Sequence, residues 1–147
     1  MVDFADAVQG MTDGWRAAMG VRFVRATVDE VVAELVVADV HRQPLGMVHG
    51  GVYAGLIESV ASVGASLFAM QEGRYAVGLE NHTSFLHAVR EGTLRAVGRP
   101  MTRGKRTHVW RADVLDEGDR IVATGTVRLI VVERGSPLGG EPAKLER

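Results

Sequence analysis

The longest apolar stretch of the chain occupies its middle third. Between residues 47 and 70 almost every position carries a small or hydrophobic side chain, and Glu58 is the only carboxylate. The hydrophobic positions fall on every side of a helical wheel, which is typical of a helix that is buried all round. We therefore predict one long helix that begins close to Gly50 and ends at Gly73.

The segments on either side of this helix are rich in β-branched residues and predict strands. Two strands are expected over residues 21–37. About four more follow the helix, separated by turns that contain glycine, over residues 74–89, 92–102, 106–116 and 119–132. Residues 3–20 indicate one or two short helices broken by Gly10 and Gly14, and residues 133–147 indicate a frayed tail.

The order of these elements predicts an α+β architecture. Short connections between the later strands favour antiparallel pairing. A single sheet curled around the long helix would bury that helix. The 147 residues suit one domain over residues 1–147, with a core that spans residues 20–132.

Composition narrows the function without identifying it. A net charge of −1 gives no reason to expect nucleic acid or an anionic membrane as a partner. The chain has no cysteine, which excludes disulfides and thiolate sites, and its histidines show no metal-ligand spacing, so we expect no metal and no cofactor. The central stretch approaches the length of a membrane span, but its carboxylate and its glycines count against that role. No secretory signal is recognisable, and a cytoplasmic protein is expected.

A carboxylate inside an apolar helix is costly and therefore informative. The side chains three, four or seven positions from Glu58 are all small, namely Gly51, Ala54, Gly55, Ala61, Ser62 and Ala65. This face lets a second helix, a strand or a ligand approach closely. Because packing alone does not require an acid, the presence of Glu58 favours a ligand as the group that approaches this face.

The start of the helix carries a second feature. His49, Gly50 and Gly51 lie where the chain enters the helix, and free N–H groups at a helix start can bind an anion or a polarised carbonyl. Glycine lets a substrate approach the backbone. Together with Gln43 before the helix and Ser62 one turn beyond Glu58, these residues indicate a site.

Several motifs follow one another in a fixed order: QPLGMVHGGV, Glu58 within the helix, VGLEN, REG, GKRTHVW and DEGDRIVA. In these motifs the sequence resembles the hotdog-fold acyl-CoA thioesterases, in the branch that contains the phenylacetate-pathway and 4-hydroxybenzoyl-CoA thioesterases. The resemblance covers residues 20–132, nearly the whole domain. It implies a long helix wrapped by a five- or six-stranded antiparallel sheet, an acyl-CoA substrate, and dimers that often pair into tetramers.

The resemblance also implies roles for individual residues. The catalytic carboxylate falls on Glu58 and the donor to the carbonyl oxygen on the backbone N–H of Gly50. The glutamine of the site falls on Gln43, the helix-start histidine on His49 and the helical hydroxyl on Ser62. Relatives often read E-I-N in the following strand, where this chain reads E-N-H at residues 80–82. We therefore assign no role to Asn81 or His82.

Thioester hydrolysis needs a donor for the carbonyl oxygen and a group that attacks the carbonyl or activates water. A donor such as the Gly50 N–H is worth about 3 kcal/mol. Glu58 could form an anhydride or act as a general base, and the sequence leaves both routes open. The two residues stand about 12 Å apart on one helix, so we expect each site to combine Gly50 of one chain with Glu58 of its partner.

Two further groups are candidates for substrate binding. The turn with Arg103, Gly104, Lys105 and Arg106 could hold the phosphates of coenzyme A, unless it is only a solvated hairpin tip. Apolar residues beside the helix suit either an acyl pocket or core packing, namely Met47, Tyr53, Val63 and Phe68.

Three other functions compete with this interpretation. A hotdog hydratase or dehydratase would need an acid–base pair, often Asp and His, where this helix offers a lone Glu58. The alternatives without catalysis are an acyl-CoA binding module and a structural oligomer with Glu58 in an interface salt bridge. The sequence does not indicate whether the acyl group is aryl, hydroxyaryl or medium-chain aliphatic.

Overall fold

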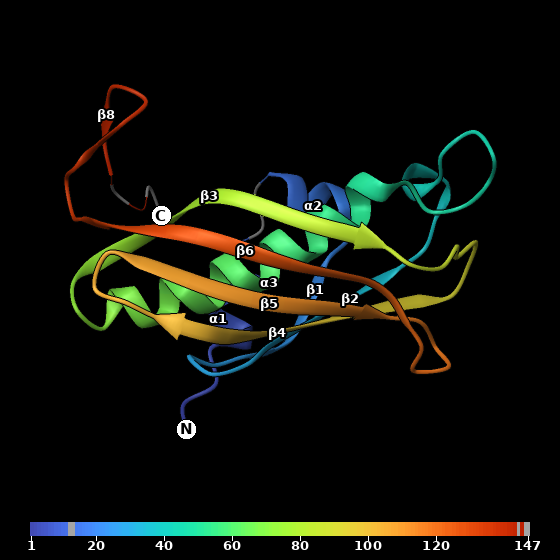
Figure 1. Cartoon of the computed structure of the whole chain (residues 1–147), viewed down its shortest axis with the longest axis horizontal. Helices are drawn as coiled ribbons and strands as arrows, with labels where there is room; N and C mark the ends of the chain where they lie inside the picture. The colour runs from blue at the N-terminus through green and yellow to red at the C-terminus, as the bar shows by residue number, and fades with distance from the viewer. Residues whose placement is uncertain (12–13, 144, 146–147) are drawn as a thin grey trace.

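One long helix lies against the concave face of a six-stranded sheet in a computed structural model, which describes residues 1–11, 14–143 and 145 (Figure 1). Every neighbouring pair of strands is antiparallel, in the order β1-β2-β4-β5-β6-β3. The predicted α+β architecture is confirmed. The helices are α1 (Ala5–Gly10), α2 (Trp15–Met19) and α3 (Gly50–Met70), and a 3-10 turn covers Asp39–His41. The strands are β1 (Arg22–Ala26), β2 (Val31–Val36), β3 (Arg74–Phe85), β4 (Thr93–Arg103), β5 (Thr107–Leu115), β6 (Ile121–Glu133), β7 (Pro137–Leu138) and β8 (Glu141–Pro142).

The core forms between α3 and the concave face of the sheet. Leu56, Ile57 and Val60 on α3 are completely buried. Alternate residues of β5 point inward, as the two-residue repeat of a strand requires, and Trp110 is the largest of them. The ring of Trp110 lies directly on Gly64, where a methyl group would overlap it. The absence of a side chain at Gly64 therefore brings α3 close to β5.

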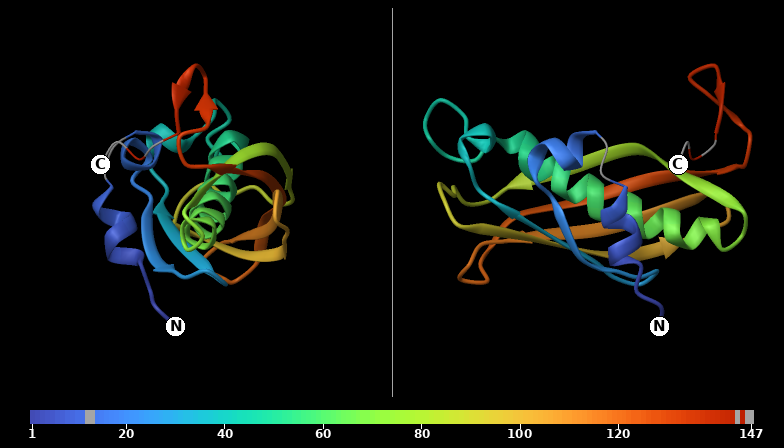
Figure 2. Two further views of the ribbon diagram at one scale, coloured as in Figure 1. Left: turned by 90° about the vertical axis from the view of Figure 1, so that its left-hand side faces the viewer. Right: turned by 180° about the vertical axis from the view of Figure 1, so that it is seen from behind.

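The small face around Glu58 is less open than the sequence suggests. Ala61 and Ala65 are fully buried and belong to the core between the helix and the sheet. Gly55 is covered by the ring of Trp15, since α2 lies across the side of α3 that the sheet leaves free (Figure 2). Only part of this face remains for a ligand or a partner chain.

Two boundaries differ from the sequence-based expectation. The helix α3 ends at Met70 rather than at Gly73, which instead takes a left-handed φ of 69° in the following turn. The tail that was expected to fray contains the short hairpin of β7 and β8, which projects from one end of the body (Figure 1). By length and composition α3 could also cross a membrane, as core helices often can, and half of its most apolar window is buried in this fold.

Candidate active site

The carboxylate of Glu58 is held by two hydrogen-bond donors from different elements. The Ser62 hydroxyl, one turn along α3, donates to Oε1 at 2.9 Å. The side-chain amide of Asn81 on β3 donates to Oε2 at 3.0 Å. Each oxygen thus has one donor, and the two hydrogen bonds fix the orientation of the carboxylate.

Asn81 is itself fixed by further contacts. Its amide also donates to the carbonyl of Ala54 at 3.1 Å, and the hydroxyl of Thr83 donates to its Oδ1 at 2.6 Å. The chain of hydrogen bonds therefore runs from Thr83 through Asn81 to Glu58 and sets the orientation of the amide. No role for Asn81 was predicted from the sequence.

Gly78 is a second residue of β3 that the sequence analysis missed. A methyl group at this position would lie 2.6 Å from Oε1 of Glu58, so the backbone of β3 passes directly beside the carboxylate. The register of β3 against β6 shifts between Gly78 and Glu80, which is a β-bulge. Bulges redirect side chains. The sequence signal for this part of β3 was the E-N-H at residues 80–82, where relatives often read E-I-N.

At the start of α3, His49 uses its own groups to satisfy the first N–H groups of the helix. Its Nδ1 accepts from the N–H of Gly51 at 2.8 Å, and its carbonyl accepts from the N–H of Val52 at 2.9 Å. Within the described part of the chain, the N–H of Gly50 has no acceptor. Gly50 thus offers a free donor at the positive end of the helix dipole.

Gln43 and Gly50 line the same cavity, which has a volume of about 280 Å³. Gln43 lies in a tight turn, where its N–H donates to the carbonyl of Met47 at 2.8 Å. Met47 and Tyr53 line this cavity as well. Burial raises the pKa of the Tyr53 hydroxyl, so this group stays neutral.

Glu58 lies on a different cavity, of about 340 Å³, together with Ser62 and Val63. The candidate residues of one chain therefore form two groups, one at the start of α3 and one at its middle. Phe68 belongs to neither group, because its ring packs edge-on against His108 and lies under the guanidinium of Arg103.

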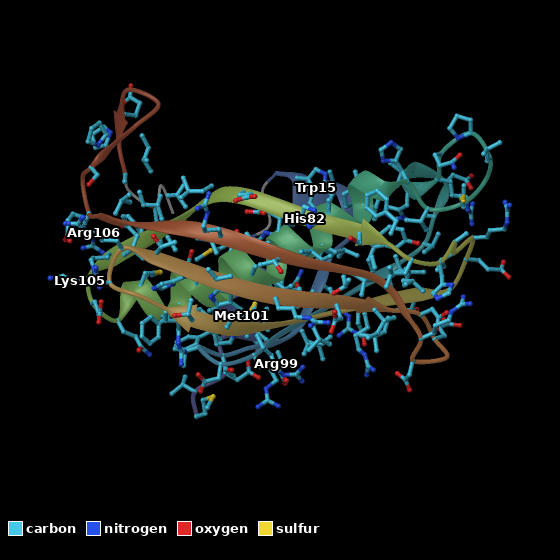
Figure 3. All side chains as sticks on the ribbon, viewed as in Figure 1. Trp15, His82, Arg99, Met101, Lys105 and Arg106 are labelled. Carbon is cyan, nitrogen blue, oxygen red and sulfur yellow. The ribbon has the colours of Figure 1, made fainter. Side chains whose placement is uncertain are left out.

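The four candidates for phosphate binding differ in how they are engaged. Arg103 donates to a carboxylate oxygen of Asp29 and to the carbonyl of Val28, each at 2.9 Å. Gly104 closes the turn to β5. Lys105 and Arg106 are exposed and lie at the end of the molecule where α3 finishes, far from Gly50 (Figure 3). Among the described residues no group of three His, Asp or Glu side chains could hold a metal ion.

Comparison with known proteins identifies the family of this fold and site. The model of the thioesterase superfamily matches residues 45–123. The protein Rv1847 of Mycobacterium tuberculosis is 38% identical over 113 residues, which cover 76% of this chain and 81% of that protein. The 1,4-dihydroxy-2-naphthoyl-CoA hydrolase of Escherichia coli K12 is 30% identical over 128 residues, which cover 86% of this chain and 93% of the hydrolase. The crystal structure of the thioesterase HI1161 of Haemophilus influenzae superimposes with a TM-score of 0.82 at 26% identity, covering 88% of this chain and 90% of that one.

These matches define the class of protein. The chain belongs to the thioesterase superfamily and has the hotdog fold of its structural relatives. It is a thioester hydrolase, as the resemblance in the sequence implied.

Proposed function

We propose that the protein hydrolyses acyl-CoA thioesters, with Glu58 as the catalytic carboxylate and the Gly50 N–H as the donor to the carbonyl oxygen. The observation that carries this proposal is the fixed carboxylate of Glu58, which takes one hydrogen bond on each oxygen and lies beside a cavity. A relative of this chain is named as a CoA hydrolase. The unengaged N–H of Gly50 supplies the second group that the reaction needs.

The reaction requires few other groups. Glu58 either attacks the carbonyl carbon and forms an anhydride that water then hydrolyses, or removes a proton from the water that attacks. In both cases the carbon–sulfur bond breaks and coenzyme A leaves as a thiolate, which takes up a proton from solvent. Gln43 lies beside Gly50 and suits contact with the carbonyl or the water.

The helix geometry supports a site in which the two groups come from different chains. Gly50 and Glu58 are eight residues apart on a straight helix, about 12 Å along its axis, whereas both must lie about 3 Å from the reacting group. We infer that a dimer completes each site, with Gly50 and Gln43 from one chain and Glu58 from its partner.

The edge strand β3 is the surface that suits this dimer. It pairs only with β6, and Leu79, Phe85 and the adjacent Leu86 are about half exposed. His82 lies on this strand (Figure 3). An antiparallel pair of β3 strands centred on His82 would set Leu79 of each chain opposite Phe85 of the other. Phe85 lies against Gly50, and the neighbour of Leu79, Gly78, lies against Glu58. This pairing therefore brings the start of one α3 toward the middle of the other.

The phosphates of coenzyme A would contact Lys105 and Arg106, since Arg103 is engaged with Asp29. Replacing both cations by serine should raise KM up to about thirtyfold with little change in kcat, because each exposed charge contributes up to about 1 kcal/mol. The matched control is Arg95→Ser, at the opposite end of β4. An unchanged KM in the variant with both cations replaced would show that the turn is only a solvated hairpin tip and does not bind the phosphates.

Release of free thiol from acyl-CoA tests the proposed reaction, and Glu58→Gln tests its carboxylate. Turnover of this variant should fall at least about a hundredfold, because an amide can neither attack nor accept a proton. Retention of near wild-type turnover by a folded Glu58→Gln protein would overturn the assignment of Glu58.

Complementation tests whether the site is shared. Homodimers of Gln43→Ala and of Glu58→Ala should both be weak. In a heterodimer of the two variants, one site lacks both residues and the other is complete, so activity should recover toward half that of the wild type. Verified heterodimers no more active than their parents, or a monomeric active species, would exclude a shared site.

A further inference from the structure

A groove runs along α3 from Glu58 toward the end of the helix. Glu58, Ser62, Ser66 and Met70 are spaced four residues apart, and all line the cavity of about 340 Å³ beside the catalytic carboxylate. The distance from Glu58 to Met70 along the helix axis is about 18 Å. At its far end this cavity shares Ser66 and Met70 with a second cavity of about 270 Å³. The two cavities therefore adjoin at this end of the helix.

The walls of this groove come from segments outside the region that the family model matches. Val8, Met11 and Arg16 belong to the N-terminal helices and the loop between them, and Leu138 and Leu145 to the C-terminal tail. The N-terminal helices lie against the side of α3 that the sheet leaves free (Figure 2). The shape of the groove thus depends on residues that lie outside the matched region 45–123.

The surface of the groove is mainly aliphatic. The hydroxyl of Ser62 is engaged with Glu58. The guanidinium of Arg16 donates to the carbonyl of Met11 at 3.2 Å and lies over the ring of Phe23. Its charge is therefore engaged by residues of the groove wall. Leu67 and Met70 follow along the helix. In the other direction Trp15 covers Gly55 and closes the groove toward the start of the helix.

We propose that this groove holds an extended aliphatic acyl chain, with the thioester carbonyl at Glu58 and the end of the chain near Met70. The inference rests on the proposed function and adds to it the class of acyl group. An aromatic acyl group would fill only the part of the groove nearest to Glu58 and would leave the apolar surface around Leu67 in contact with water. A longer flexible chain covers that surface.

The groove has a measurable consequence for selectivity. Each methylene that moves from water into it should improve kcat/KM about three- to fourfold until the chain reaches the end of the groove. Among the CoA thioesters of butanoate, octanoate, dodecanoate and benzoate, the wild-type protein should prefer octanoate or dodecanoate. Benzoyl-CoA should be a poorer substrate than an aliphatic acyl-CoA with the same number of acyl carbons.

The variant Ser66→Phe tests the position of the chain. A phenyl group at this position would block the groove two turns beyond Glu58, so kcat/KM for dodecanoyl-CoA should fall at least about tenfold while that for butanoyl-CoA changes little. The matched control is Met101→Phe, because Met101 is 64% exposed on the outer face of β4 (Figure 3). This control should keep the chain-length profile of the wild type.

The outcomes separate this inference from the proposed function. If all thioesters are hydrolysed with dependence on Glu58 but benzoyl-CoA is preferred, or if Ser66→Phe leaves dodecanoyl-CoA unaffected, the groove does not hold the acyl chain and the proposed function stands. If Glu58→Gln retains activity on every thioester, the proposed function fails first. A folded Ser66→Phe protein that loses activity equally on every chain length also overturns the inference, because a blocked groove spares short chains.

Discussion

The side-chain amide of Asn81 donates a hydrogen bond of 3.0 Å to Oε2 of Glu58 and thereby joins the edge strand β3 to the proposed catalytic carboxylate on α3. Ser62 holds the other oxygen from the same helix. The carboxylate is thus positioned from two directions, and one of them is the strand on which we propose that two chains meet. A dimer formed along β3 would therefore be linked to the geometry of the carboxylate.

Asn81→Leu should reduce kcat by about ten- to a hundredfold, because a misplaced catalytic group loses this much. It should change KM less. The control Ser84→Ala lies on the same strand and should behave as the wild type. An Asn81→Leu protein with normal kcat would show that Ser62 alone is sufficient to hold the carboxylate.

The sequence predicts the contact between Glu58 and Ser62 but not the contact with Asn81, and the physical reason is distance along the chain. Residues four apart on a helix are neighbours whatever the rest of the fold does. Asn81 reaches Glu58 only because β3 crosses α3 and because a bulge after Gly78 sets which side chains of the strand face the helix. One inserted residue in a strand reverses its faces, so this contact requires a structure.

The cover over Gly55 is another feature that local pattern does not predict. The small residues around Glu58 are evident in the sequence, and so is a short helix at Trp15. That Trp15 lies on Gly55 is a long-range contact across most of the N-terminal part of the chain. In contrast, the strands and the long helix follow from local periodicity, whereas the pairing of β2 with β4 and of β6 with β3 joins strands that are not consecutive in the chain.

Gly78→Ala should impair catalysis with little effect on stability. The added methyl group would lie 2.6 Å from Oε1 of Glu58, and the flexible end of that side chain can move away at low cost. The carboxylate would then leave its position, so kcat should fall about tenfold or more while the midpoint of thermal unfolding changes little. Gly10→Ala is the control, because nothing lies within 4 Å of a methyl group there. Full activity of Gly78→Ala would show that Glu58 tolerates displacement.

His82→Cys tests the proposed pairing of two β3 strands. The natural chain has no cysteine, so the introduced thiols would be the only ones present. Opposed residues in an antiparallel pair lie about 4.5–5.5 Å apart between Cα atoms, within the range that a disulfide spans. Mild oxidation should therefore give a covalent dimer on a gel without reductant, and Met101→Cys should give none. Cross-linking through Thr83→Cys instead would move the axis by one residue, and none at either position would contradict the pairing.

Gly64→Ala should destabilise the protein although alanine is the better helix former. In an exposed helix this change would gain about 1 kcal/mol. Here the methyl group would overlap the buried ring of Trp110, and such overpacking costs about 1–3 kcal/mol. Urea unfolding should show a lower midpoint with an unchanged slope. If Trp110→Leu in the same chain does not reduce the penalty, the overlap with the ring is not its cause.

His108 should make the protein less stable in mild acid. It is 1% exposed, and burial, followed by the positive charges of Arg103 and Arg74, lowers its pKa below the ordinary value of 6.5. Between that ordinary value and the lower value in the fold, the unfolded chain binds the proton more readily, so stability is complete above the unfolded pKa and declines as the pH falls through this window.

The variant His108→Phe keeps an aromatic ring against Phe68 and removes the titratable group. The drop in melting temperature from about pH 7.5 to about pH 5 should therefore be smaller in His108→Phe than in the wild type. His87→Phe serves as the control because His87 is exposed, and it should leave the drop unchanged. Equal acid sensitivity of the wild type and His108→Phe would show that other groups dominate unfolding in this range.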